Sequence, residues 1–372
     1  MRILFDHQAF TGNKYGGVAR YFHQLMTNLR KKGHRVRLSL WISHNVYLDQ
    51  DPNIRVWKAP LWLGKKWSNL LFSQLNRLAS TLWLLSRQYD LVHITFFHDY
   101  FLHFIGNKPF VLTYHDLIKE KFGTRYLNLD NANFEQKKKL LDRASAIIAV
   151  SHHTKQDLID IFQIPAHKIT VIHHACVFGK NPPDDSIQVV TPPHYFLYVG
   201  ARNDYKNFPS FLQAFQLIAV KYPEIQLICA GGGNFNRAEQ KLIHELGLQN
   251  RVEFRGFQED EILYRLYQQA IAFVYPSLYE GFGIPILEAF AAQCPVLLSN
   301  ASCFPEVAQA AALYFDPQVP QSIANQMERI WIEQHLRDQL IASGKERLKD
   351  FSQEKLAQQT IAVYQQVLQD KL

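Results

Sequence analysis

The sequence lacks the patterns that mark several common protein classes. No apolar run of about 18 residues occurs, so no membrane-spanning helix is expected. The first residues, MRILFDHQAF, carry no apolar segment behind a basic one, and we expect no secretory signal peptide. No Lys/Arg block, zinc-finger spacing or RNP-like run is present, so no nucleic-acid partner is expected. No G-x-G-x-x-G follows the first apolar run, which disfavours a nicotinamide dehydrogenase.

Cysteine is also scarce. The four cysteines, none of them at C-x-x-C spacing, are Cys176, Cys229, Cys294 and Cys303. Cysteines used in this way are typical of small, reduced core residues, so a cytoplasmic location is expected.

The apolar content is high enough for two hydrophobic cores. The 372 residues are 47% hydrophobic, which suits two globular domains. Lys and Arg number 40 against 33 Asp and Glu, and the resulting net charge of +7 fits a nucleotide, a polyanion or an anionic membrane as partner.

Short apolar strands alternate with amphipathic helices in both halves of the chain. This alternation predicts an α/β fold with two doubly wound, Rossmann-like domains that face one cleft. Residues 180–193, KNPPDDSIQVVTPP, hold four prolines and follow no period, as is typical of a linker. We therefore assign 1–180 to the first domain, 181–193 to the linker and 194–352 to the second domain.

The stretch 271–290, IAFVYPSLYEGFGIPILEAF, predicts a buried strand, a glycine-containing loop and a short helix. The glycines allow a ligand close to the backbone, and the free amides at the start of the helix suit a phosphate. Glu280 in the loop and Glu288 in the helix can each accept paired hydrogen bonds from sugar hydroxyls. Two solvated glutamates at this spacing also arise by chance. The combination nevertheless suggests a nucleotide-sugar site.

Other polar residues follow predicted strands, at the edge where open α/β sheets bind ligands. His115 comes directly after the strand 110–114, where it can bond a sugar hydroxyl, although a lone histidine is often structural. Arg202 and Lys206 follow the strand 195–200, and two cations so placed suit a diphosphate.

Two further backbone segments can approach a ligand. Gly16 and Gly17 lead from the first strand loop into a helix, although the pair is also typical of a plain tight turn. Backbone groups near Gly256 and Phe257 follow another strand and are candidates for contact with a nucleotide base.

Residues 56–88 are rich in tryptophan and leucine. One helical stripe predicts a core-facing amphipathic helix; its members are Trp67, Leu71, Leu75, Leu78, Leu82 and Leu85. More apolar residues lie off this stripe than a solvated helix usually carries. We hypothesise that residues 62–85 touch an anionic bilayer surface or a lipid-linked acceptor, with lysines meeting the headgroups. Simple burial of the aromatic residues is the alternative.

These segments together resemble the retaining glycosyltransferases of GT-B fold in the glycosyl transferases group 1 family, also called glycosyltransferase family four. The resemblance is carried by SLYEGFGIPILEAFA with the continuation PVLLSNASCFPEVAQAAALYFDP, by FLYVGARNDYKNF, by AIIAVSHHTKQDLIDIF and by the Gly16-Gly17 turn. It covers nearly the whole chain. Two positions depart from the family pattern, Ala175 and Ala201, and the second makes the assignment of the neighbouring Arg202 less direct.

The resemblance implies roles for particular residues. Lys206 and Arg202 would hold the donor diphosphate, Glu280 would face the transferred sugar, Glu288 the ribose, and His115 the sugar near the reacting carbon. Backbone amides would assist the diphosphate; they belong to Gly16, Gly17, Phe282 and Gly283. The first domain would bind the acceptor and the second the donor, with the C-terminal helix 353–372 returning to the first domain.

The expected activity is therefore retaining, metal-independent transfer of a sugar from a nucleoside-diphosphate sugar, with GDP-mannose favoured over a UDP-sugar. No cofactor and no metal are expected. The acceptor would be a glycan or lipid-linked glycan of surface polysaccharide biosynthesis, at the cytoplasmic face of a membrane. A non-catalytic GT-B subunit that binds nucleotide or a partner transferase is the alternative; the presence of Lys206, Glu280 and Glu288 disfavours it.

Overall fold

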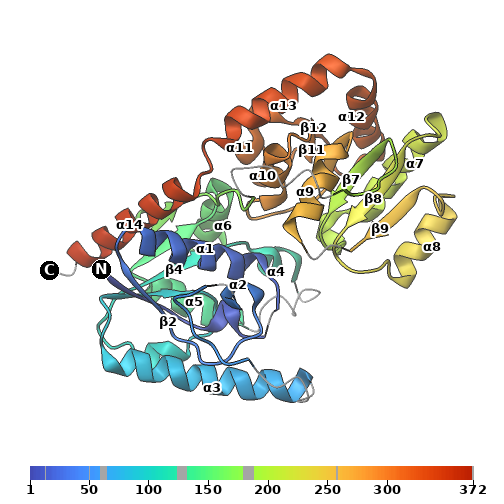
Figure 1. Ribbon diagram of the computed structural model, residues 1–372. Coiled ribbons are helices and arrows are strands. Elements are labelled where there is room, and N and C mark those ends of the chain that lie inside the picture. Colours follow the sequence, from blue (N-terminus) through green and yellow to red (C-terminus); the bar gives the residue numbers. More distant parts are fainter. Residues whose placement is uncertain are drawn as a thin grey trace. The chain divides into compact units, whose positions relative to one another are not determined.

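The computed structural model describes residues 1–12, 14–49, 51–58, 65–123, 132–178, 188–256 and 259–370, with the backbone alone for 65–70. The chain divides into two compact units. Unit 1 comprises Met1–His174 and Gln353–Leu372, and unit 2 comprises Ala175–Ser352. Each unit is a sheet covered by helices (Figure 1). The linker predicted at 181–193 lies partly outside the described residues.

The sheet of unit 1 is parallel throughout. Within the described residues its six strands run in the order β2-β1-β3-β4-β5-β6. The strands are β1 (Arg2–Phe5), β2 (Arg35–Leu38), β3 (Leu91–Ile94), β4 (Phe110–Tyr114), β5 (Ala146–Ala149) and β6 (Ile169–Val171). The helices are α1 (Gly17–Lys31), α2 (Val46–Asp49), α3 (Lys65–Ser86), α4 (Ile118–Phe122), α5 (Phe134–Arg143), α6 (His152–Phe162) and α14 (Gln353–Gln369).

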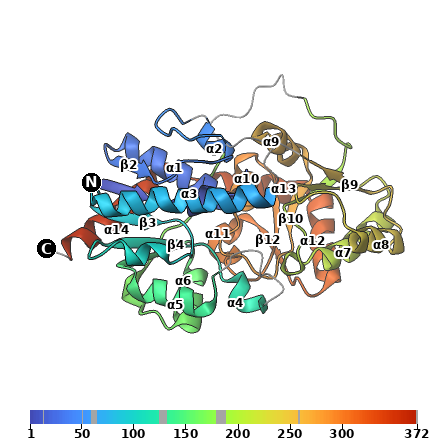
Figure 2. The same ribbon diagram turned by 90° about the horizontal axis from the view of Figure 1, so that it is seen from below.

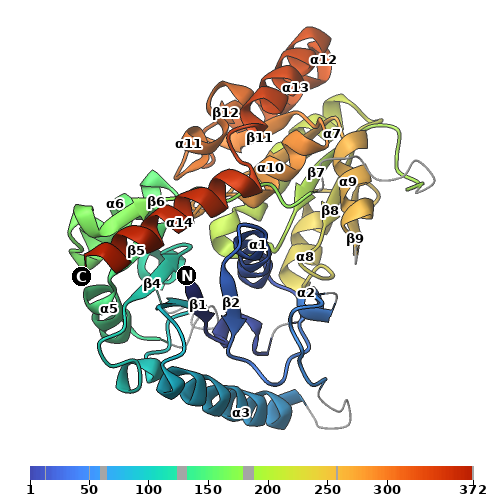
Figure 3. The same cartoon turned by 60° about the vertical axis from the view of Figure 1, so that its left-hand side comes forward.

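Helix α14 comes from the far end of the sequence and packs against α1 (Figure 3). Two polar pairs join these segments: Lys32 Nζ lies 2.8 Å from Glu354 Oε1, and Gln353 Nε2 donates to Gln24 Oε1 at 2.7 Å. Deeper in unit 1, the hydroxyl of Tyr364 lies 2.5 Å from Nδ1 of His93 on β3. The last helix therefore supplies part of the core of the first unit.

Helix α3 is a long helix of unit 1 (Figure 2), and it faces the core with the opposite side from the one predicted. Phe72, Asn76 and Leu84 are buried, whereas four leucines of the predicted core stripe are about half exposed: Leu71, Leu78, Leu82 and Leu85. A polar contact accounts for this orientation: Asn76 Oδ1 accepts from the amides of Trp41 and Ile42 at 3.0 and 2.9 Å, which anchors the Asn76 side to the segment that follows β2. No helix within the described residues has both the length and the apolarity to cross a membrane.

The sheet of unit 2 is likewise parallel, and its six strands within the described residues run in the order β12-β11-β10-β7-β8-β9. The strands are β7 (Tyr195–Val199), β8 (Gln226–Ala230), β9 (Val252–Arg255), β10 (Ala272–Tyr275), β11 (Val296–Ser299) and β12 (Leu313–Phe315). The helices are α7 (Phe208–Lys221), α8 (Arg237–Glu245), α9 (Asp260–Gln269), α10 (Ile284–Ala291), α11 (Phe304–Ala308), α12 (Pro320–Ile332) and α13 (Gln334–Leu348).

Central strands of unit 2 are almost entirely apolar or aromatic because helices cover both faces of a parallel sheet. Every residue of β7, β10 and β11 is buried. Phenylalanines of α7 fill the layer above the sheet: Phe208, Phe211 and Phe215 are all buried in one cluster with α12. The predicted alternation of strands and helices in both halves is confirmed.

Candidate active site

Neighbouring strands β7 and β10 of unit 2 bring the predicted acidic and basic residues to one edge of the sheet. The two strands pair in parallel, so their carboxyl ends lie at the same edge. A short 3-10 turn, Asp204–Lys206, follows β7, and the loop 276–283 follows β10. The amide of Leu278 donates to the carbonyl of Tyr205 at 2.8 Å, which ties the loop to the turn.

Lys206 and Glu280 form an ion pair at this edge. Nζ of Lys206 lies 2.5 Å from Oε1 of Glu280 and donates to the hydroxyl of Tyr275 at 3.1 Å. The two charged side chains are only 12% and 11% exposed, so water screens their attraction weakly. Burial, together with the nearby charge of Glu280, raises the pKa of Tyr275 well above its ordinary value. The pair places one cation and one carboxylate within reach of the same ligand.

The backbone of Glu280 is held independently of its side chain. Its amide donates to Oγ of Ser302 at 3.0 Å, and that hydroxyl donates to the carbonyl of Glu280 at 2.5 Å. The thiol of Cys303 also donates to this carbonyl, at 3.2 Å. The backbone position of Glu280, in the segment that follows β10, is therefore fixed by the segment that follows β11.

Gly283 caps α10 in a conformation that favours glycine, with φ of +92°. A Cβ at this position would lie 3.0 Å from both Ile286 Cδ1 and Phe304 Cε1. The preceding Phe282 is buried and packs edge-on against Phe351, with ring centroids 5.7 Å apart. The amides of the first turn of a helix lack helical acceptors, so this end of α10 suits an anion.

Glu288 lies in α10 and is buried. Its Oε2 accepts a hydrogen bond from the hydroxyl of Tyr267 at 3.1 Å. Burial, and then the charge of Glu288, raises the pKa of Tyr267 well above its ordinary value, so this phenol stays protonated and donates. Tyr267 orients the carboxylate, and the sequence did not single it out.

The structure gives Arg202 partners that the sequence did not predict. Its Nε donates to Glu239 at 3.0 Å, and its terminal nitrogens donate to the carbonyls of Gly231, Gly233 and Asn234 at 3.0, 2.6 and 3.1 Å. The side chain is 2% exposed and lies over the ring of Phe235, 4.9 Å from its centroid. Four of its five N–H groups are thus engaged, so in this arrangement Arg202 fixes the loop after β8. Its diphosphate contact stays a prediction.

The loop after β8 carries three consecutive glycines with positive φ, Gly231, Gly232 and Gly233. A Cβ on Gly232 would lie 2.5 Å from the carbonyl oxygen of Gly200, at the end of β7. The ends of β7 and β8 can therefore meet only because this residue has no side chain.

In unit 1, Gly16 and Gly17 lie at the start of α1, and the local fold does not require glycine at either position. Gly16 has an extended φ of 174°, and an added Cβ on either residue would meet nothing within 4 Å. The carbonyl of Gly16 accepts the first helical bond, from Arg20, at 3.0 Å. The local backbone therefore does not require glycine at either position, and contact of this pair with a ligand stays a prediction.

His115 follows β4 and is paired with a second histidine. Its Nδ1 lies 3.4 Å from Nε2 of His174, and the two rings are stacked with centroids 5.4 Å apart. The ring of Tyr21 contacts both edge-on, at centroid distances of 5.2 and 4.8 Å. Nε2 of His115 is buried and has no hydrogen-bond partner among the described residues. That atom is accordingly the one that can bond a sugar hydroxyl.

Both histidines are neutral near pH 7. Burial lowers the pKa of His115 to about 4, and burial followed by the charges of His115 and His173 lowers that of His174 well below its ordinary value. His174 was missed in the sequence, although it follows β6 in VIHHACV as His115 follows β4 in VLTYHD. The shared position at a strand end was the available signal.

Two expectations find no test in the described residues. Phe257 lies outside them. No group of three or more His, Cys, Asp or Glu residues in the described ranges could hold a metal ion, and metal independence stays a prediction. The four cysteines carry no disulfide.

Comparison with known protein families accounts for both halves of the chain. The model of the family described as "Glycosyl transferases group 1" matches residues 184–347, and that of "Glycosyltransferase Family 4" matches residues 15–176. The first range contains Lys206, Glu280 and Glu288, and the second contains Gly16 and His115.

Similar curated proteins include two mannosyltransferases. The chain is 32% identical over 268 residues to O-antigen chain mannosyltransferase B of Escherichia coli, which covers 68% of this chain and 69% of the relative. It is also 32% identical over 188 residues to O-antigen chain mannosyltransferase RfbU of Salmonella typhimurium, covering 50% and 51%.

Among solved structures, sucrose-phosphate synthase from Thermosynechococcus elongatus has a TM-score of 0.78 over 100% of both chains at 22% identity. Anabaena HepE in complex with UDP and glucose has a TM-score of 0.73 at 18% identity, over 98% of this chain and 100% of that one. Likeness at this level of identity concerns the fold, and it confirms the predicted GT-B class.

Proposed function

Because the chain belongs to the glycosyl transferases group 1 family, we propose that it moves mannose from GDP-mannose to a glycan or lipid-linked acceptor in surface polysaccharide biosynthesis. The chain is a hexosyltransferase. Its mannosyltransferase relatives support the choice of sugar, and GDP is proposed as the nucleotide ahead of UDP. Transfer would retain the anomeric configuration of the donor.

The observation that carries this proposal is the pairing of Lys206 with Glu280 where β7 and β10 end, 2.5 Å apart. Cleavage of the anomeric bond develops negative charge on the departing diphosphate and positive charge on the sugar ring. Lys206 and the first turn of α10 would stabilise the former, and the carboxylate of Glu280 would orient the sugar. Fixed charges in a water-poor site supply such stabilisation without reorganisation, which supports chemistry that needs no metal.

Unit 1 offers groups for the sugar side of the reaction. His115 presents a neutral ring whose Nε2 can bond a hydroxyl, and no atom lies within 4 Å of a Cβ built on Gly16 or Gly17, which leaves room for a ligand beside the backbone. The assignment of these residues to the same donor rests on the family resemblance. Retention would follow from attack of the acceptor hydroxyl on the face that the diphosphate leaves.

The test uses the full chain with a panel of GDP, UDP, ADP and NAD. GDP should raise the melting temperature most, and GDP-mannose with candidate lipid-linked glycans should give an α-linked product by NMR, with undiminished turnover in EDTA. A larger shift with UDP would overturn the choice of nucleotide, and an inverted anomer would overturn retention. A shift with GDP but no transfer to any acceptor would indicate a non-catalytic subunit.

We also propose a peripheral position at the inner face of the membrane, through residues 62–85. The support is the outer face of α3, where Leu71, Leu78, Leu82 and Leu85 are 47%, 51%, 50% and 54% exposed. Such a stripe on a helix suits the headgroup boundary of a bilayer. In flotation with vesicles that contain phosphatidylglycerol, the wild type should rise with the lipid, and the double variant Leu78→Ser/Leu82→Ser should remain behind. Equal flotation of both would contradict the contact.

A further inference from the structure

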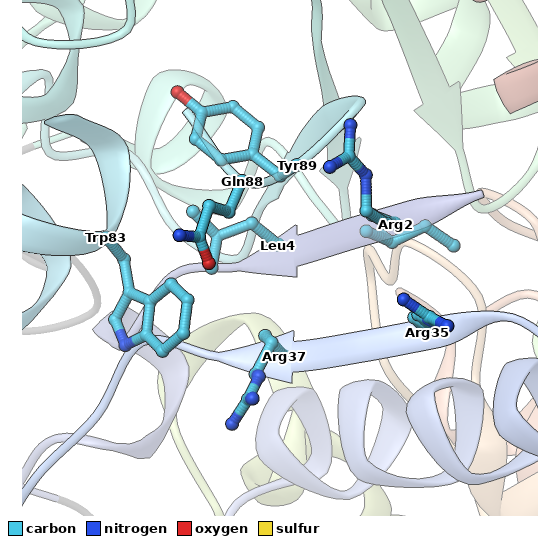
Figure 4. A pocket seen from close by; sticks show the side chains of 8 residues that line it. Arg2, Leu4, Arg35, Arg37, Trp83, Gln88 and Tyr89 are labelled. Carbon is cyan, nitrogen blue, oxygen red and sulfur yellow. The ribbon is translucent and has the colours of Figure 1, made fainter. Parts of the chain in front are cut away.

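A small cavity lies at the amino end of strands β1 and β2, away from the strand ends that carry the candidate active site. Its volume is about 210 Å³, and it is lined by side chains from β1, β2, α3 and the segment that leads to β3. Figure 4 shows Arg2 on β1, Arg35 and Arg37 on β2, and Trp83 on α3. The volume exceeds what a single water needs and suits a small polar group.

The three arginines that line the cavity carry more positive charge than the neighbouring carboxylate of Asp90 can neutralise. Arg2 forms a forked pair with Asp90, with Nε and one terminal nitrogen 3.0 and 2.7 Å from Oδ1. The guanidinium groups of Arg35 and Arg37 have no hydrogen bond or ion pair with any described residue. Arg2 and Arg35 are direct neighbours across the two strands, where like charges repel. An anion in the cavity would relieve this repulsion.

The other walls fit a phosphate bound at a surface. The guanidinium of Arg37 lies over the Trp83 ring, 4.9 Å from its centroid, which holds the fork in place. Gln88 lines the cavity with a side-chain amide that has no partner among the described residues and can donate a hydrogen bond. Guanidinium forks match phosphate oxygens in pairs, so the donor set favours a phosphate over a simple halide.

The position of Trp83 indicates where that phosphate comes from. Trp83 directly follows Leu82 along α3, and Leu82 is one of the leucines exposed on the outer face of this helix. We propose that the cavity binds the phosphate of an anionic phospholipid headgroup while the leucines of α3 enter the headgroup boundary. This inference rests on the membrane contact proposed above. It adds a specific headgroup site to a contact that apolar burial alone would leave non-selective.

Charged residues on β2 have a simpler alternative role. β2 is the edge strand of its sheet, and arginines on an edge discourage pairing with another chain. Protection of the edge strand requires only charged side chains, whereas the proposed site requires a phosphate. The dependence of binding on lipid composition therefore distinguishes these two roles of the arginines.

The experiment measures partition of the full chain onto vesicles of phosphatidylcholine with and without phosphatidylglycerol. The double variant Arg35→Gln/Arg37→Gln should bind the anionic vesicles at least tenfold more weakly, since each basic residue near such a surface contributes about fivefold. The matched control is Arg143→Gln with Lys138→Gln, which removes two charges from α5 of the same unit and should stay within about twofold of the wild type. Soluble glycerol phosphate should compete with the wild type and not with the double variant.

Two results would overturn the headgroup site: equal losses in the β2 and α5 double variants, which would mean bulk charge, or no loss in the β2 variant. Arg37→Lys keeps the positive charge and removes the forked guanidinium, so this variant should lose most of the affinity for anionic vesicles. Melting temperature and the GDP-induced shift serve as the fold control, and both should be unchanged in every variant. If Leu78→Ser/Leu82→Ser abolishes vesicle binding and the arginine variants do not, the membrane contact stands and the headgroup site fails.

Discussion

Lys206 and Glu280 are joined to each other at 2.5 Å and share Tyr275 as a neighbour, so the cation of the candidate site is neutralised before any ligand arrives. A diphosphate that bound here would compete with the carboxylate for the ammonium group. Glu280 would then be released toward the hydroxyls of the sugar. In the proposed reaction the pair would thus couple recognition of the phosphate to recognition of the sugar.

This coupling predicts a difference between stability and activity. Lys206→Met and Glu280→Gln should each lower the free energy of unfolding of unit 2 by about 3 kcal/mol, because each leaves a nearly buried charge without its partner. The double variant should regain much of that loss in denaturant unfolding.

Turnover should fall by about 100-fold or more in all three proteins, since no variant retains both groups. Tyr275→Phe is the matched control, because it removes a hydroxyl from Lys206 and keeps the ion pair. Recovery of transfer in the double variant would mean that the pair is structural and has no part in the reaction.

Arg202 offers a separate prediction about the loop after β8. Arg202→Lys keeps the charge and loses the fork that holds three carbonyl groups, so the melting temperature of unit 2 should fall. Glu239→Gln, which weakens the same clamp from its other side at 3.0 Å, should also lower it. An Arg202→Lys protein that melts normally and fails to bind GDP would instead support the diphosphate role assigned from the sequence.

Gly232 and Gly233 form a matched pair with similar backbone angles and different surroundings. Gly232→Ala would place a Cβ 2.5 Å from a backbone oxygen, whereas Gly233→Ala would meet nothing within 4 Å. Both changes carry the strain of a positive φ, about 1 kcal/mol. Gly232→Ala should cost several times more, as measured by denaturant unfolding, and equal costs would contradict the packing described between β7 and β8.

The stability of unit 1 should depend on pH through its buried histidines. Burial lowers the pKa of His93 from 6.5 to about 3, so the unfolded chain takes up the proton first and stability is lost as the pH falls below 6.5. At pH 5 this single group accounts for about 2 kcal/mol. Burial raises the pKa of Asp6 to about 6, which acts in the opposite direction and offsets about 1 kcal/mol between pH 7 and 5.

His93→Gln should therefore flatten the dependence of unfolding free energy on pH between 7 and 5. His167→Gln, which replaces an exposed histidine of the same unit, should keep the slope of the wild type. An unchanged slope in His93→Gln would show that this histidine does not stay neutral in the fold.

The alternation of strands and helices was predictable because buried parallel strands are continuous apolar runs, and the strand Phe110–Tyr114 has the predicted bounds. The partners of side chains were not. Arg202 was expected to meet a ligand, and its engagement depends on three carbonyls of a loop about 30 residues later. Helix α3 shows the same limit. The hydrogen bonds of Asn76 accompany burial of its side of the helix, and hydrophobic periodicity, which favoured the side with the leucines, does not take such polar contacts into account.

The hydrogen bond between His93 and Tyr364 closes a loop of 271 residues, with all of unit 2 inside it. Unit 2 is continuous in sequence and can fold as soon as it has left the ribosome. Unit 1 begins first and is completed last, because α14 follows unit 2 in the chain and reaches α1 and β3 only after unit 2 has been made. Until then, the surface that α14 covers is exposed, so the chain carries an unfinished domain while unit 2 is made, and a truncation after residue 352 would make that state permanent.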